Sequence, residues 1–138
     1  MSDVTLRPAP KPFTLLSTHS GSTSEIAITN MVVDGVSGSL GYYTIKQGQK
    51  GKIYEADLAA KDETIAFIEE CKNLTTTPLA WLKIKTLYAP SAGHIGRSWR
   101  YPVILEAYEY DIGIRVAFQQ TSSARVDVSM HGEVSPLE

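Results

Sequence analysis

Three histidines are the residues of this sequence best suited to acid–base chemistry or metal binding. His19, His94 and His131 lie far apart, and none belongs to an H-x-H, H-x-x-x-H or H-E-x-x-H pair. Zinc sites normally contain such local ligand pairs. We therefore expect three dispersed histidines and neither a metal site nor a histidine-based catalytic centre.

A single cysteine and several carboxylates offer the other routes to catalysis. Cys71 excludes an internal disulfide, and its place on the apolar side of a predicted helix does not favour a reactive thiolate. Glu106 and Glu109 fall on opposite faces of a predicted strand. Asp127 and Glu133 share a face but stand roughly 20 Å apart, too far for the acid and base of a glycosidase. The sequence predicts no catalytic, cofactor-binding or metal site, and hence a protein that is not an enzyme.

Two further stretches have the composition of ligand-binding loops. Ser17–Thr23 contains hydroxyls and a glycine but lacks the spacing of a phosphate-binding G-x-x-x-x-G-K-[ST] motif, so a plain loop is predicted there. In Gly93–Tyr101, basic and aromatic residues alternate, as in proteins that stack single-stranded nucleic acid. Strand alternation places Trp99 and Tyr101 together, toward the core or an interface, and Arg100 outward. We expect no specific nucleic-acid site.

The composition indicates one folded domain without an evident charged partner. The chain has 138 residues, 43% of them hydrophobic and 20% charged, with a net charge of -2. This length is enough to bury a core, and no global basic field attracts nucleic acid or a membrane surface. The start of the chain lacks the apolar core of a signal peptide, and no apolar stretch reaches the roughly 18 residues of a membrane span. We expect synthesis and retention in the cytoplasm.

The hydrophobic pattern predicts a mainly β fold. β-Branched and alternating stretches predict strands at Glu25–Val33, Tyr42–Ile45, Lys52–Leu58, Leu79–Tyr88, Ser98–Asp111, Ile114–Gln120 and Arg125–Val134. Asp34-Gly35 is a strong turn signal, and Pro102 places its strand at an edge or bulge. Apolar residues at threefold spacing, with Asp62 as a cap, predict one helix over Asp62–Asn73. The expected fold is an antiparallel β-sandwich or barrel with one packed α-helix: residues 1–12 form an extended arm and residues 13–138 a single domain.

The last predicted strand alternates almost perfectly. Val126, Val128 and Met130 point to one face, whereas Asp127, Ser129, His131 and Glu133 point to the other. The first face must meet a core. The second is polar, and bulk water, a channel or a neighbouring subunit could each lie against it.

The order of elements from Asp62 to Pro136 resembles the tail tube proteins of tailed bacteriophages. It consists of the predicted helix, "PLAWLKIKTLY", a loop, "RSWRYPVILEAYEYD", and a closing strand pair that ends on "VDVSMHGEVSP". The sequence departs from the family in its loop at Ala89–Gly96, which is longer than expected. The resemblance implies a β-sandwich with one helix that assembles into hexameric rings stacked around a DNA channel.

For the individual residues, the resemblance implies two assembly surfaces and no cofactor. The glycine-rich stretch Val36–Gly51 lies where the family carries a long hairpin or loop that contacts the next ring. The hairpin tip at Lys46–Gly51 then supplies ring contacts: Lys46, Gly48, Lys50 and Gly51. Asp127, Ser129 and Glu133 become a lumen or subunit face. The implied partners are copies of the chain and other virion proteins, with DNA only as transient cargo; the implied location is the virion, assembled in the host cytoplasm.

Other functions remain open at this level. One is a different tail, neck or capsid-associated structural protein. Another is a ligand-binding β-sandwich module with Trp81, Trp99 and Tyr88 as an aromatic platform. A third is a small hydrolase that uses His94 or His131, which requires a pocket where catalytic groups converge.

Overall fold

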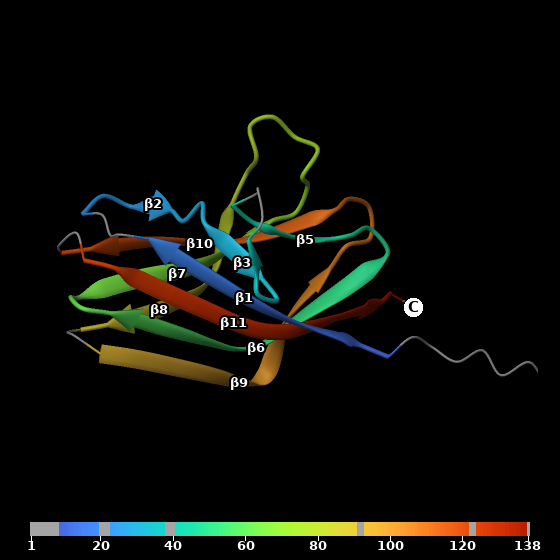
Figure 1. Cartoon of the computed structure of the whole chain (residues 1–138). Coiled ribbons are helices and arrows are strands. Elements are labelled where there is room, and N and C mark those ends of the chain that lie inside the picture. The colour runs from blue at the N-terminus through green and yellow to red at the C-terminus, as the bar shows by residue number, and fades with distance from the viewer. Residues whose placement is uncertain (1–8, 20–22, 38–40, 91–92, 122–123, 138) are drawn as a thin grey trace, which may run out of the picture.

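The computed structural model describes residues 9–19, 23–37, 41–90, 93–121 and 124–137. These residues form strands and their connections, without a helix, and the strands build two antiparallel sheets that face each other (Figure 1). The described part of the chain thus contains no helix of the length and apolarity that crossing a membrane requires.

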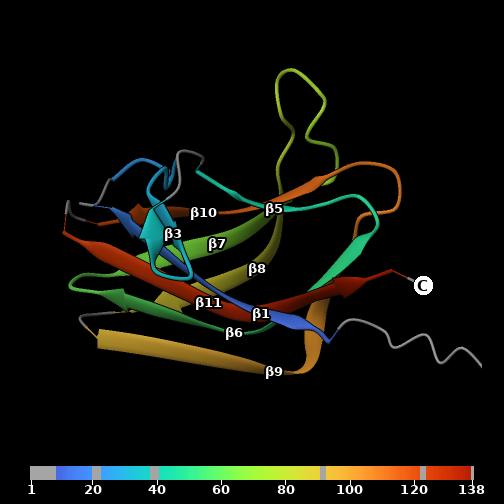
Figure 2. The same ribbon diagram turned by 45° about the vertical axis from the view of Figure 1, so that its right-hand side comes forward.

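The strands divide between the sheets without regard to their order in sequence. Six of the described strands form one sheet, in the order β4 (Val36–Ser37), β3 (Met31–Val33), β1 (Lys11–His19), β11 (Val126–Pro136), β6 (Gln49–Ala60), β9 (Gly93–Glu106). The other sheet has the order β2 (Ile26–Ala27), β10 (Ile112–Gln120), β7 (Thr64–Cys71), β8 (Leu82–Ala89), and β5 (Tyr43–Ile45) also pairs with β10. The connection 72–81 projects beyond both sheets (Figures 1 and 2).

The core lies between the inner faces of the two sheets. Leu15 and Met130 contribute from the six-stranded sheet, and Ile114 and Phe118 from the other; all four are fully buried. The two-residue period of each strand supplies these side chains, because every second residue points inward. The prediction of a mainly β, antiparallel two-sheet fold is confirmed.

The predicted helix over Asp62–Asn73 is wrong. Its centre is strand β7, which pairs with β10 on one side and β8 on the other. Ile65 is exposed between buried Thr64 and Ala66, so the observed period is two residues. The threefold spacing of apolar residues was compatible with a helix, but ladder hydrogen bonds to two neighbours and β-branched side chains favour a strand here.

The other predicted strands are present with shifted bounds, but the loop predicted over Ser17–Thr23 is wrong for Ser17–His19, which form the end of β1. Asp34 and Gly35, with φ of 50° and 84°, form the turn between β3 and β4, as their sequence predicts. The predicted strand Glu25–Val33 is split into β2 and β3, which belong to different sheets. The predicted N-terminal arm of residues 1–12 is two residues too long, because Lys11 and Pro12 already pair with β11; residues 1–8 lie outside the described residues.

Two local predictions about turns and faces need correction. Lys46–Gly51 is not a hairpin tip: β5 and β6 belong to different sheets, and the chain crosses between them at this point. Tyr101 does not share the buried side of Trp99, because it is 80% exposed. The pairing of β9 with β6 skips from Ser98 to Val103, so alternation fails in between. Pro102 lies in this stretch of an edge strand, as predicted.

Candidate functional site

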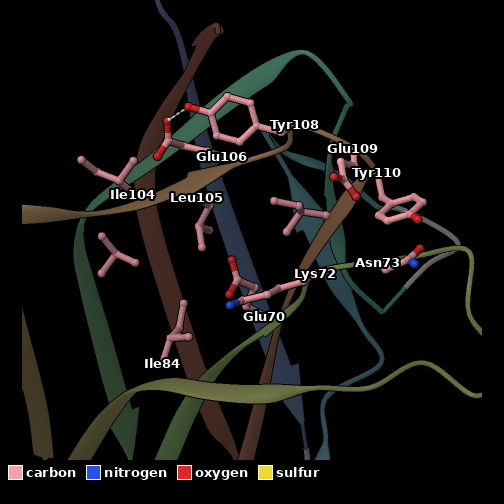
Figure 3. Close-up of a pocket in the computed structure, with 12 residues that line it drawn as sticks. Glu70, Lys72, Asn73, Ile84, Ile104, Leu105, Glu106, Tyr108, Glu109 and Tyr110 are labelled. Atoms are coloured by element: carbon pink, nitrogen blue, oxygen red, sulfur yellow. Dashed lines mark hydrogen bonds between the residues drawn. The ribbon is translucent and has the colours of Figure 1, made fainter.

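A groove of about 600 Å³ opens where β7 and β8 face the second half of β9 and the connection to β10 (Figure 3). This volume lies in the range of sites for small molecules. Its apolar lining comes from Ile84, Val103, Ile104, Leu105 and Ile112. The groove therefore combines a size and an apolar surface that suit a compact ligand.

Glu70 is the polar side chain inside this groove. It is only 7% exposed, and its partner across the ladder is the fully buried Ile114, so it points between the sheets. Among the described residues its carboxylate has no hydrogen bond or ion pair. Burial raises the pKa of Glu70, and the positive charge of Lys72 opposes that shift. An acid of this kind can exchange a proton or accept a cation.

We expect Glu70→Gln to stabilise the protein at neutral pH by about 1 kcal/mol, because it removes a carboxylate buried without a partner. The raised pKa means that folded protein holds this proton more tightly than the unfolded chain. Proton binding by Glu70 therefore stabilises the folded protein fully below the ordinary pKa of 4.5. This stabilisation is lost as the pH rises through the pKa that Glu70 has in the folded protein. Urea unfolding of both proteins from pH 4 upward measures the difference.

The other titratable groups that line the same groove set the control for this measurement. They are Lys72 from the end of β7, Glu106 from β9, and Glu109 from the following connection. Because these groups titrate in both proteins, the difference between the two curves isolates Glu70. A variant less stable than the natural protein at neutral pH would mean that the carboxylate has a stabilising partner.

The rim of the groove carries tyrosines and two more carboxylates. The Tyr108 hydroxyl donates to Glu106 at 2.8 Å, and this hydrogen bond raises the pKa of Tyr108. Glu109 and Tyr110 follow on the same connection (Figure 3). The prediction that Glu106 and Glu109 lie on opposite faces fails, since the strand ends at Glu106 and both residues line the groove.

The predicted lumen or subunit face lies on the outer side of the six-stranded sheet. Asp127, Ser129 and Glu133 belong to β11, between β1 and β6, and each is half-buried. Thr18 donates its hydroxyl to Asp127 at 2.8 Å, and Arg125 pairs with the same carboxylate at 3.1 Å. The structure therefore brings these residues together on one polar face, with partners from neighbouring strands.

Hydrogen bonds continue across this face. Tyr54 donates to Glu133, and this bond raises the pKa of Tyr54. His131 lies 3.9 Å from the Glu55 carboxylate, which also accepts a hydrogen bond from Ser98 at 3.2 Å. The face is polar and is stabilised by contacts between neighbouring strands.

The predicted ring-contact residues do not form one loop. Lys46 is exposed and pairs with Asp111 at 3.7 Å. Gly48 occupies the turn with φ of 88°, whereas Lys50 and Gly51 already belong to β6. Backbone hydrogen bonds join Gly48 to the carbonyl of Ala107 and to the amide of Leu137. The turn is thus hydrogen-bonded to Ala107, just after β9, and to Leu137, the last described residue.

The predicted aromatic platform is dispersed. Trp81 lies on the outer side of the second sheet beside Tyr42, with ring centroids 5.7 Å apart. Trp99 packs against the core edge with the Lys85 amine 5.5 Å from its ring. Tyr88 donates to Glu63 on another part of the molecule. The three aromatic side chains therefore do not form one binding surface for a ligand.

A charged cluster around Glu69 went unnoticed in the sequence. The Glu69 side chain is 5% exposed, and its carboxylate accepts a hydrogen bond from Arg115 Nε at 2.7 Å. The Lys83 amine lies 3.5 Å from the other oxygen. Arg115 also lies 4.3 Å from the Trp81 ring centre. These contacts join side chains of β7, β8 and β10, so the cluster stabilises the second sheet.

The predicted catalytic candidates whose side chains the structure describes do not converge on one site. His19 packs against Phe118, with ring centroids 5.2 Å apart, and His131 lies on the outer polar face. The side chain of His94 lies outside the described residues. Cys71 is buried, as expected, and its thiol donates to the Asn73 carbonyl at 3.3 Å. Within the described ranges, His, Cys, Asp and Glu nowhere gather in threes suitable for a metal ion.

Comparisons with known proteins do not identify a family for this chain. No family model and no curated protein matches the sequence. Among solved structures, the chain is similar to that of Bacillus endospore appendages, described as a novel family of disulfide-linked pili. The match has 7% identity and a TM-score of 0.47, and it covers 100% of this chain and 99% of that chain. The function therefore has to be inferred from the surfaces of this chain.

Proposed function

We propose that the chain is a structural subunit that assembles with copies of itself. The observation that carries the proposal is the number of exposed large apolar side chains on β9 and the connection after it. They are Tyr101, Ile104, Tyr108 and Tyr110, and together they are called here the tyrosine surface. All four side chains are exposed, and they come from β9 and the connection that follows it. Tyrosine is enriched at protein interfaces, and clustered exposed apolar side chains mark interaction sites.

The position of β9 strengthens this proposal. β9 spans 14 residues and is the terminal strand of its sheet, paired with β6 on one side. A long edge strand presents unpaired backbone groups that can pair with another chain. At the opposite edge, β3 and β4 are short, and Val36 is strongly exposed. Contact between these unlike edges would be heterologous, and such contacts generate rings or filaments.

In its finer form, the proposal is a phage tail tube subunit. The outer face that carries Asp127, Ser129 and Glu133 would then line a channel through stacked hexameric rings. Carboxylates on such a wall repel the phosphates of passing DNA, whereas Lys and Arg would hold them through counterion-releasing contacts. The polar hydrogen-bonded face of β11 supports this arrangement. Other virion proteins would be further partners, and the virion would be the location.

Assembly can be tested by sedimentation and negative-stain electron microscopy over increasing protein concentration. We expect rings or filaments from the natural chain. Tyr101→Ser combined with Ile104→Ser should raise the concentration needed for assembly by about tenfold or more, because buried tyrosines often dominate an interface. Leu82→Ser, at an exposed position of the other sheet, is the matched control. A natural chain that stays monomeric at every concentration would refute self-assembly.

A further inference from the structure

The groove that contains Glu70 has the features of a binding site in its own right, beyond the proposed role in assembly. We propose that this groove binds a small organic ammonium ion that carries an apolar body, such as an aryl-alkyl amine. Glu70 would accept the ammonium group, and the apolar lining would hold the body. The Tyr108 and Tyr110 rings would close the rim.

Glu70 supplies the first argument. Glu70 is only 7% exposed, it lines the groove, and no other described residue donates to its carboxylate. A buried carboxylate without a partner is unfavourable, because it loses hydration without a compensating contact. A cation that enters the groove can provide the missing partner. The geometry thus calls for a donor with positive charge at this point.

The lining supplies the second argument. Leu105 and Ile112 are buried at the floor, and Ile84 and Val103 pack against the core. These side chains are held in place by the sandwich, so the site is preformed. A pocket of about 600 Å³ with a few placed polar groups is typical of small-molecule sites. Among the described residues no three acidic, histidine or cysteine side chains gather in a way that could hold a metal ion, so an organic cation fits this groove better than a metal.

The charges and rings at the rim supply the third argument. The charged residues that line the groove are three carboxylates, Glu70, Glu106 and Glu109, and one ammonium group, Lys72. This balance favours a cation over an anion. Tyr108 and Tyr110 add aromatic faces, which attract organic ammonium groups when these come within about 6 Å. Figure 3 shows both rings on the connection after β9, with Glu70 and Lys72 reaching in from the β7 side.

Lys72 is the internal competitor of such a ligand. It is exposed, and its charge acts on Glu70 without a described ion pair between them. If Lys72 swings onto Glu70 in the free protein, an incoming ammonium group must displace it. Removal of the lysine amine then strengthens ligand binding. If Lys72 instead formed a permanent ion pair with Glu70, the carboxylate would not be available to a ligand.

The test uses isothermal titration calorimetry on the full chain with three probes of similar shape. These are 2-phenylethylammonium, 2-phenylethanol and phenylacetate. We expect saturable binding of one ammonium ion per chain, and affinities at least about 30-fold weaker for the alcohol and the anion, because each lacks the charged partner of Glu70. Equal affinity for the alcohol and the ammonium, or no saturable ammonium binding, overturns the proposal.

Two variants locate the site. Glu70→Gln should weaken ammonium binding by about 30-fold, whereas Lys72→Met should strengthen it. The reverse result, with weaker binding to Lys72→Met or unchanged binding to Glu70→Gln, overturns the assignment. The comparison of three probes on the natural chain decides the matter even if a variant fails to fold. Tyr101→Ser alone changes a residue that does not line the groove, so it separates failure of assembly from failure of binding.

Discussion

Replacing Gly132 by alanine should destabilise the protein by about 3 kcal/mol, since an extra carbon in a tightly packed interior forces backbone shifts. A Cβ at this position would collide with the carbonyl oxygen of Lys52 and lie 2.6 Å from the Phe13 ring. Because the carbonyl belongs to the backbone of the neighbouring strand, a side-chain rotation cannot relieve the clash. Urea unfolding monitored by circular dichroism measures the loss.

The cause is the irregular pairing of β11 with β6. The register shifts between His131 and Gly132, and the altered course of β6 brings the Lys52 carbonyl close to Gly132. Ser129→Ala on the same strand is the matched control, with an expected change within about 0.5 kcal/mol. If Gly132→Ala proved as mild as this control, the two strands could not approach as closely as the structure shows.

Replacing Arg115 by alanine should cost about 3 kcal/mol, because it leaves the buried Glu69 carboxylate without its principal partner. The Nε–Oε1 distance of 2.7 Å and the 5% exposure of the Glu69 side chain make this the most enclosed ion pair among the described residues. Lys83 remains 3.5 Å from the same carboxylate, but it is itself exposed. Thermal and urea unfolding provide the measurement.

A double variant separates charge from packing at this cluster. Arg115→Met with Glu69→Leu removes both charges and keeps much of the volume, so we expect stability close to that of the natural protein. Methionine can also maintain contact with Trp81, which lies 4.3 Å from the arginine head group. A double variant as unstable as Arg115→Ala would assign the loss to packing around Trp81 and not to the unpaired Glu69.

Local patterns in the sequence were sufficient for several parts of the fold. The alternation of β11 correctly separated Val126 and Met130 from Asp127, because one strand fixes its own faces. Asp34-Gly35 determined its turn through backbone conformations that suit these residues. Pro102 marked an edge strand because it lacks an amide donor. Each of these features depends on residues close together in the chain.

Only the tertiary structure decided the rest. Residues 64–71 became a strand because β8 and β10 pair with both of their edges, a condition that their own spacing does not encode. The groove unites Glu70 with Leu105 and Tyr110 through the packing of two sheets, and Glu69 meets Arg115 from 46 positions away. The sequence determined the mainly β class and the polar side of β11. The packing of strands that are distant in sequence determined that Glu69 meets Arg115, whereas Glu70 lies in the groove without a described partner.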